Sequence, residues 1–231
     1  MQKLIVANWK ANKNLVASEH FLNNFPKELA EKLRQNSSQR VLIAPPYPVL
    51  GQMQRLIKHQ ALPIELAVQD LSAFGAGAFT GEVAAENLEF LGVKMAILGH
   101  SERRRLLKES SQLISDKIRQ ALIVDMEVLL CVDEDNFIEQ AKLLTSTERS
   151  LIKVAYEPLK AIGSGQALQA EAVGQFFTQL RAFFPENQLL YGGSVKANNI
   201  QDFLKISDGV LIGGASLQLE TFVPLLQNCL L

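Results

Sequence analysis

Short apolar runs alternate with amphipathic segments along the whole chain. Eight of the runs have the length and composition of strands, and they fall at residues 3–8, 40–44, 64–68, 95–98, 127–131, 151–156, 188–191 and 209–212. Several of them, such as residues 95–98, are apolar at every position, which is typical of a parallel sheet buried on both faces. The segments between them predict helices at residues 17–34, 48–59, 84–90, 112–124, 136–144, 167–183, 197–204 and 217–226.

Eight strands that alternate with eight helices predict a (β/α)₈ barrel of the α/β class. An open, doubly wound sheet is the alternative. Such a sheet usually carries a glycine-rich dinucleotide fingerprint at its first strand-to-helix turn, but Asn8, Trp9 and Lys10 stand there instead. Because α/β barrels occupy about 200 to 250 residues, the 231 residues are expected to form a single domain, from residue 1 to residue 231.

The net charge and the number of cysteines limit which partners and which cellular compartment are expected. A formal net charge of −1 gives no electrostatic reason to expect nucleic acid or an anionic membrane as a partner. The first apolar run ends at Asn8, too early for a signal peptide, and no later run approaches a membrane span. Cys131 and Cys229 are expected to remain thiols, and no histidine or cysteine pair has metal-ligand spacing. We therefore expect a soluble, cytoplasmic protein without a catalytic metal.

A barrel of this kind carries its site on the loops that follow the strands, so the polar residues there are the candidates. Asn8 and Lys10 follow the first strand, where the lysine could form a Schiff base, pair with a carboxylate or hold an anion. His100 follows the fourth strand, and a helix that begins just after it would disfavour the imidazolium. Glu157 ends the sixth strand, and Pro158 keeps it in an extended conformation.

Glycines follow three of the predicted strands. Gly163 lies in a short apolar and glycine-rich segment after Glu157, which has the composition of a lid over a phosphate site. Ser194 follows two glycines after the seventh strand, and Gly213 and Gly214 follow the eighth. Loops after the seventh and eighth strands bind phosphate in many barrels, so these turns predict an anion site made of backbone N–H groups.

The segment from Gln69 to Glu82 is unusually long for a connection, and it carries Phe74 and Phe79 among small residues. Long loops without secondary structure in compact domains are usually functional. Exposed aromatic side chains there would favour insertion into a partner, and a self-complementary contact would make a homodimer. The alternative is that both rings fold back onto their own domain.

Taken together, these motifs resemble those of the triosephosphate isomerase family, in its bacterial and eukaryotic form, over essentially the whole chain. The matching stretches, in chain order, are residues 8–10, 77–82, 99–104, 155–165, 191–195 and 213–217. The resemblance implies a TIM barrel, usually a homodimer, that needs no cofactor. It also implies the interconversion of dihydroxyacetone phosphate and D-glyceraldehyde 3-phosphate, in glycolysis and gluconeogenesis.

The resemblance further implies the role of each candidate residue. Glu157 would move a proton between two carbons, and a neutral His100 would polarise the carbonyl group. Lys10 would supply positive charge and Asn8 a hydrogen bond to the negative charge that develops. The phosphate group would be held by Gly163, Ser194, Gly213 and Gly214.

Three positions depart from the family's usual pattern. Lys160 replaces a tryptophan at the N-terminal hinge of the lid, which predicts altered populations of the open and closed lid, or an altered rate of exchange between them. Asp70 replaces an asparagine and is expected to add a charge near Lys10 or near the dimer contact. Asp133 replaces a glycine after the fifth strand, which puts the usual turn there in doubt.

Two other functions are compatible with the residues. A barrel aldolase could use Lys10 as a Schiff-base nucleophile, although the Glu157 segment has no obvious purpose in such an enzyme. A catalytically weak paralogue that serves as a binding protein would explain the three departures, but not the presence of all the catalytic residue types.

Overall fold

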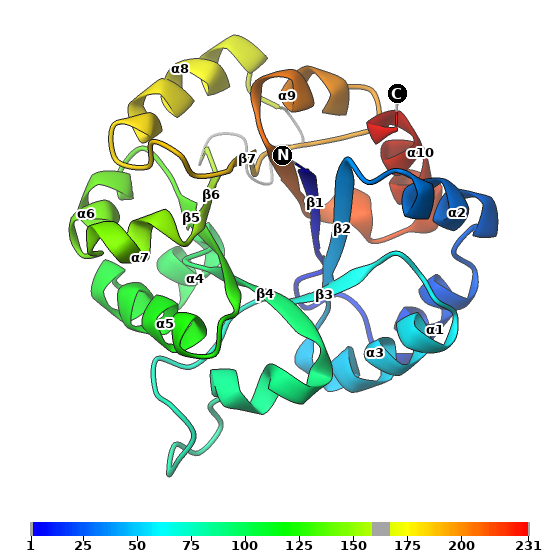
Figure 1. The fold of residues 1–231 in the computed structure, drawn as a ribbon, viewed down its shortest axis with the longest axis horizontal. Coiled ribbons are helices and arrows are strands. Elements are labelled where there is room, and N and C mark those ends of the chain that lie inside the picture. The colour runs from blue at the N-terminus through cyan, green and yellow to red at the C-terminus, as the bar shows by residue number, and fades with distance from the viewer. Residues whose placement is uncertain (1, 159–166, 231) are drawn as a thin grey trace.

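Eight parallel strands close into a barrel in chain order (Figure 1). The structure is a computed structural model that describes residues 2–158 and 167–230. The predicted TIM barrel is confirmed, because each strand pairs with its neighbours in sequence and β1 pairs with β8. The strands are β1 (Lys3–Asn8), β2 (Gln39–Ala44), β3 (Glu65–Val68), β4 (Val93–Leu98), β5 (Glu127–Val132), β6 (Lys153–Tyr156), β7 (Leu189–Tyr191) and β8 (Gly209–Ile212).

Helices form the outer layer around the barrel (Figure 1). The α-helices are α1 (Leu15–Asn23), α2 (Lys27–Gln35), α3 (Leu50–His59), α4 (Ser101–Leu106), α5 (Ser111–Ile123), α6 (Phe137–Lys142), α7 (Ser146–Ser150), α8 (Ala170–Arg181), α9 (Ile200–Ile206) and α10 (Leu219–Cys229). Short 3₁₀ helices are η1 (Tyr47–Val49), η2 (Ala85–Leu91) and η3 (Gly214–Ser216). Within the described residues, no helix is both long enough and apolar enough to cross a membrane.

Several helix boundaries differ from the prediction. The single helix predicted at residues 17–34 is wrong, because Pro26 caps α2 and the chain breaks between α1 and α2. The segment predicted as a helix at residues 84–90 is the 3₁₀ helix η2. The strand predicted at residues 151–156 begins only at Lys153, because Leu151 ends the unpredicted helix α7. Thr145 and Glu148 cap α7 reciprocally, so their spacing was the signal for this helix.

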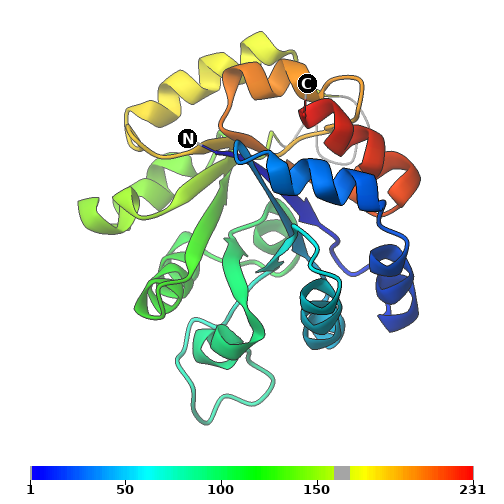
Figure 2. The same ribbon diagram turned by 45° about the vertical axis from the view of Figure 1, so that its right-hand side comes forward.

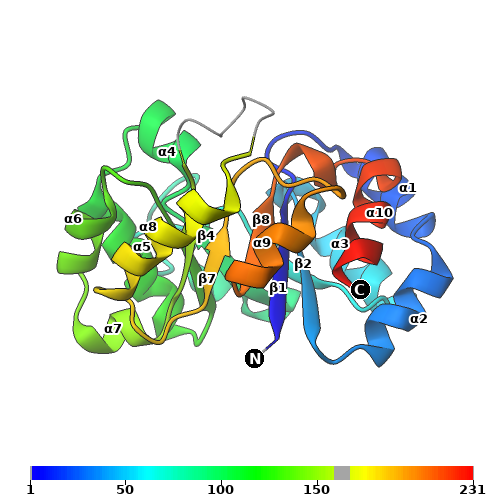
Figure 3. The same ribbon diagram turned by 90° about the horizontal axis from the view of Figure 1, so that it is seen from above.

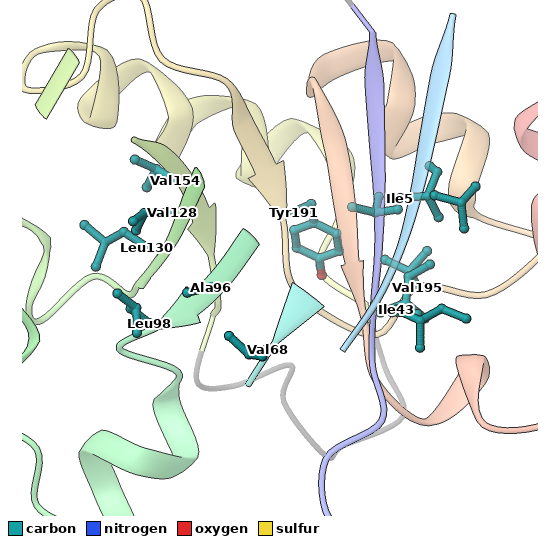
Figure 4. Close-up of a cluster of buried hydrophobic side chains, with 14 of the residues drawn as sticks. Ile5, Ile43, Val68, Ala96, Leu98, Val128, Leu130, Val154, Tyr191 and Val195 are labelled. Atoms are coloured by element: carbon teal, nitrogen blue, oxygen red, sulfur yellow. The ribbon is translucent and has the colours of Figure 1, made fainter. Parts of the chain in front are cut away.

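The alternation of side chains along each strand divides the buried residues into two groups. A smaller cluster made only of strand residues, including Leu4, Val6 and Ala155, fills the barrel interior. The larger cluster packs between the barrel and the helices, and Figure 4 shows members from successive strands, such as Ile5, Ile43 and Val68. The inward-facing rows lead to the residues of the candidate site, because Asn8 and Glu157 continue them at the C-terminal ends of β1 and β6.

The two ends of the barrel are distinct. Seen from the side in Figure 3, the N-terminus lies at one end and α4 lies at the other, beside the C-terminal ends of the strands. The loop at residues 69–82 extends away from the barrel in Figures 1 and 2. Phe74 and Phe79 stack on each other at 4.4 Å in this loop, and they remain 49% and 43% exposed. The rings are therefore not buried against their own barrel.

Candidate active site

A cavity of about 330 Å³ opens at the C-terminal ends of the strands. All the predicted site residues that the structure describes line it, namely Asn8, Lys10, His100, Glu157, Ser194, Gly213 and Gly214. Gly163, and the departure at Lys160, lie in residues 159–166, outside the described residues. The cavity thus joins residues that are up to 206 positions apart in sequence, counted from Asn8 to Gly214.

Glu157 and His100 are in direct contact at the cavity. Glu157 is only 3% exposed, and its Oε1 lies 3.0 Å from Nε2 of His100. Its Oε2 accepts a hydrogen bond of 2.8 Å from the backbone N–H of Ser101, the first residue of α4. The other ring nitrogen of His100, Nδ1, accepts from the backbone N–H of Glu102 at 3.2 Å. Because Nδ1 accepts, the ring proton is on Nε2, and the neutral imidazole donates to Glu157.

Competing effects set the protonation of Glu157. Burial raises the pKa of this carboxyl, but the contact with His100, the Ser101 N–H and the charge of Lys10 lower it by more, so its pKa lies below the ordinary value. Glu157 is therefore a carboxylate at neutral pH. In this conformation both of its oxygens are held by hydrogen-bond donors.

Lys10 lies across the cavity in a strained backbone conformation. Its φ is +51°, which is uncommon for a residue with a side chain. Its backbone N–H donates to Oδ1 of Asn8 at 3.0 Å, and its carbonyl accepts from Nε2 of Gln69 at 2.8 Å. The ammonium group pairs with Oε1 of Glu102 at 2.6 Å. Three neighbours thus hold this lysine in a conformation that aims its charge at the cavity.

The turn after β7 needs glycine for a packing reason. A Cβ atom at Gly193 would lie 2.1 Å from the Tyr191 hydroxyl oxygen, which no side chain could tolerate. That hydroxyl accepts a hydrogen bond of 3.1 Å from the backbone N–H of Leu168. Ser194 then follows at the cavity wall, which Gly213 and Gly214 also line, where η3 begins. The predicted glycine-rich turns therefore line the same cavity.

The structure resolves two of the three departures. The Asp70 carboxylate pairs with Lys117 at 2.7 Å and with Arg103 at 2.6 Å, so its charge is taken up there and not at Lys10. The Asp133 carboxylate accepts from the backbone N–H groups of Asp135 and Asn136 at 2.9 and 3.1 Å. The turn after β5 is therefore closed by the side chain of Asp133.

The candidate list from the sequence omits three residues that hold the site together. Ser101 and Glu102 bind Glu157, His100 and Lys10, and Gln69 supports the backbone of Lys10. Ser101 and Glu102 stand in the polar run after the fourth strand, where the sequence predicts only the start of a helix. Gln69 directly follows an apolar strand, as Asn8 does, and that position was its signal. In the described part of the chain, no group of three or more metal-ligating side chains is close enough to hold a metal ion.

The closed α/β barrel places a carboxylate, a neutral imidazole and an ammonium group around one cavity. This arrangement defines the class of barrel enzymes that catalyse by proton transfer. The family model described as "Triosephosphate isomerase" matches residues 3–229. The triosephosphate isomerase of Mycoplasma mobile is 35% identical, over 98% of this chain and 99% of the relative. The enzyme of Mesomycoplasma hyopneumoniae is 34% identical, over 99% of this chain and 100% of the relative. The enzyme of Idiomarina loihiensis is 34% identical, over 97% of this chain and 96% of the relative. The chain belongs to the triosephosphate isomerase family, which confirms the predicted isomerase class.

Proposed function

We propose that this chain interconverts dihydroxyacetone phosphate and D-glyceraldehyde 3-phosphate, a step of glycolysis and gluconeogenesis. The observation that carries the proposal is the contact of Glu157 with the neutral imidazole of His100, in a cavity that Lys10 also lines. Proton transfer next to a carbonyl group requires a base, a hydrogen-bond donor for the oxygen and a stabilising charge. These three groups are within reach of one small substrate.

Glu157 is the base. Its carboxylate removes a proton from the carbon next to the carbonyl group, which leaves an enediolate, and the carboxyl group returns the proton to the neighbouring carbon. The two triose phosphates are isomers, so the reaction needs no oxidant and no reductant. His100 donates its Nε2 proton to the carbonyl oxygen and helps to move a proton between the two enediolate oxygens. Substrate therefore replaces the 3.0 Å contact between Glu157 and His100.

Lys10 and Asn8 stabilise the negative charge that grows on the enediolate oxygens. The ion pair of Lys10 with Glu102 at 2.6 Å fits this role, because it fixes the position of the Lys10 side chain at the cavity. A Schiff-base aldolase would need the free amine of Lys10 as its nucleophile, and an ion-paired ammonium group is a poor one.

The phosphate group of the substrate binds opposite the base. Backbone N–H groups at Ser194, Gly213 and Gly214 are the donors among the described residues that line that side of the cavity. Gly163 completes the set in the proposal that the sequence motif supports. Lys10 is close to this side, since a Cβ atom built on Gly213 would lie 3.8 Å from its Nζ.

The proposed active form is a homodimer through the loop at residues 69–82. Support comes from the two stacked rings in this loop and from Leu106 and Leu107 at the end of α4, which are 68% and 61% exposed. Asp substituted at both Phe74 and Phe79 should halve the particle mass in sedimentation. An unchanged mass in this variant, with a dimeric parent, would place the interface elsewhere.

The proposal includes one domain and a cytoplasmic location. A single domain covering residues 1–231 is supported by the pairing of β1 with β8, which joins the two ends of the chain in one sheet. The cytoplasm is supported by two buried cysteines, Cys131 and Cys229, that are free thiols.

A coupled assay that follows D-glyceraldehyde 3-phosphate to dihydroxyacetone phosphate tests the function. The parent chain should turn over rapidly, and Glu157→Gln, prepared in parallel, should lose the activity because an amide cannot accept the proton. Equal and negligible rates in both proteins would reject the isomerase function and favour a binding role. Rapid turnover at the same rate in both proteins would identify a contaminating host enzyme.

A further inference from the structure

Arg104, in α4, is held behind the C-terminal ends of β4 and β5 by neutral acceptors. Its Nε donates to the carbonyl oxygen of Gly99 at 2.8 Å. Its Nη2 donates to the carbonyl oxygen of Cys131 at 3.3 Å and to Oε1 of Gln140 at 2.9 Å, while Nη1 lies 3.4 Å from Oγ of Ser111. One guanidinium group therefore joins the ends of two strands to α5 and α6.

No carboxylate pairs with Arg104 in the part of the chain that the structure describes. Its neighbour Arg103, by contrast, contacts both Asp70 and Glu109 at 2.6 and 2.7 Å. Gln140 is fully buried, and its amide nitrogen donates to Ser111 and Ser115, which fixes its oxygen towards the guanidinium. A partly buried cation surrounded by dipoles costs free energy, so its charge calls for a functional explanation.

The backbone at Gly99 leaves room for the guanidinium group of Arg104. Gly99 has φ +73°, and a Cβ atom there would lie 2.8 Å from Nη2 of Arg104 and 3.2 Å from the carbonyl oxygen of Cys131. The next residue is His100. Arg104 therefore fixes the peptide group that sets the direction of the imidazole.

Cys131 connects the guanidinium with the base. Its carbonyl oxygen contacts Arg104, and its side chain belongs to the cluster inside the barrel, on the row that faces Glu157. The pKa of the thiol is raised well above its usual value, by burial first and then by the charge of Glu157. The other groups that face Glu157 are His100 and Lys10.

Three further carboxylates lie near Arg104, besides Glu157. They are Asp133 and Glu109, together with Glu139, which accepts a hydrogen bond of 2.9 Å from Ser111. None of these carboxylates contacts the guanidinium directly. These carboxylates therefore weaken the electric field of the guanidinium group only from a distance. The field acts on the cavity across Cys131.

We propose that Arg104 is a positioning residue of the site, which orients His100 through Gly99 and favours negative charge on Glu157 and on the reacting oxygens. This inference rests on the proposed isomerase function. Arg104 touches no substrate in this account. It acts through the strand ends and through its uncompensated positive charge.

Three variants separate the effect of the positive charge of Arg104 from the effect of its hydrogen-bond geometry. Arg104→Met removes the charge, Arg104→Lys keeps the charge but loses the fork of donors, and Gln140→Glu keeps the arginine but places a carboxylate against it. Arg105→Gln, at the exposed next position of α4, is the matched control. The readouts are kcat, KM and the acid limb of kcat/KM against pH, with thermal unfolding to report folding.

Arg104→Met should lower kcat about tenfold with a smaller change in KM, and should move the acid limb upward by about half a pH unit. The limb moves up because loss of a nearby cation raises the pKa of Glu157. Gln140→Glu should move the limb in the same direction, and Arg104→Lys should leave the limb in place while it lowers kcat. Arg105→Gln should match the parent.

A purely structural Arg104 predicts a different pattern. Gln140→Glu would then keep the parent's kinetics, and all variants that fold would keep the parent's acid limb, which would overturn the proposal. If Arg104→Met does not fold, Gln140→Glu and Arg104→Lys give the same decision. An inactive parent chain would reject the proposed function itself, and that outcome is distinct from parent-like variants of an active chain.

Discussion

The N-terminal end of the barrel and the candidate site at its C-terminal end treat charge in opposite ways. At the N-terminal end, Arg40 binds Glu65 through two N–H groups at 3.0 and 2.6 Å, and Glu127 at 3.1 and 2.8 Å. Lys153 adds a contact of 2.6 Å to Glu127. Two cations and two carboxylates from β2, β3, β5 and β6 thus neutralise one another in a closed network.

In the candidate site, charges are left partly uncompensated, although a paired cluster lies beside it, made of Asp70, Glu109, Arg103 and Lys117. Glu157 is a carboxylate held by a neutral imidazole and a backbone N–H, and Arg104 is a cation held by neutral oxygens. Lys10 has an ion pair but a strained backbone. The same inward-facing rows produce both ends, since Lys153, Ala155 and Glu157 follow one another on β6 and its end. Compensated charge stabilises a fold, whereas uncompensated charge and strain are typical of an active site.

The largest effect is expected at the C-terminal end. Lys10→Met removes the ammonium group from the cavity and should lower kcat/KM by about a thousandfold, as the loss of a transition-state stabiliser does. Lys13→Met is the control, because Lys13 lies over the rings of Trp9 and Phe21, 5.0 Å from each, and does not line the cavity. Steady-state kinetics should show a large loss only for Lys10, and equal losses would contradict the contrast between these lysines.

The N-terminal end should respond in stability instead of activity. Arg40→Met leaves Glu65 and Glu127 without their shared partner, and should lower the free energy of unfolding by about 2 kcal/mol. The loss is smaller than for a fully buried pair, because these carboxylates are 34% and 29% exposed. Urea unfolding measures it, and kcat below the unfolding range should stay within about twofold of the parent. A large loss of kcat in the folded variant would break the division between the two ends.

The stability lost in Arg40→Met should depend on pH, which sharpens the comparison between the two ends of the barrel. Burial raises the pKa of Glu127, but Arg40 and Lys153 lower it by more, so the folded pKa lies below the ordinary 4.5. A depressed folded pKa gives stability that is present above the unfolded pKa and is lost as the pH falls through the folded value. The difference in stability between the parent and Arg40→Met should therefore shrink below about pH 4.5. A difference that stays constant from neutral pH to pH 3 would show that lost packing, not charge, explains the effect.

The smallest effect is expected at Asp133, which is polar but lies outside both networks. Asp133→Asn keeps an oxygen for the backbone N–H groups of Asp135 and Asn136 and should change stability by less than about 0.5 kcal/mol. Asp133→Ala loses that acceptor and should cost about 1 kcal/mol in thermal or urea unfolding. Equal stabilities for the two variants would mean that the carboxylate does not close the turn.

The barrel and most of the cavity could be predicted from the sequence, because both depend on local patterns. Parallel strands leave continuous apolar runs, and the polar residues that end them, such as Asn8, His100 and Glu157, mark the C-terminal edge. The helix boundaries were less predictable. Pro26 splits one predicted helix, and the reciprocal cap of Thr145 and Glu148 makes another.

The partners within the site could not be predicted, because they are set by packing between distant segments. Nothing local shows that Asp70 binds Lys117, or that Gln140 lies against Arg104. The start of a helix after His100 favours a neutral ring, but the tautomer depends on the contact from the backbone N–H of Glu102 to Nδ1. Residue types were therefore predictable, whereas charge compensation was not.

Transfer of a carbon-bound proton by Glu157 is the central claim, and the most direct test is turnover of dihydroxyacetone phosphate in D₂O. The proton on the carboxyl group of Glu157 can exchange with solvent before it is returned, so part of the D-glyceraldehyde 3-phosphate should carry deuterium on the carbon that received it. Proton NMR of the product measures this fraction. Deuterium in the product of the parent chain, with no turnover by Glu157→Gln, is the predicted result. Rapid turnover by the parent without any deuterium on carbon would contradict the account.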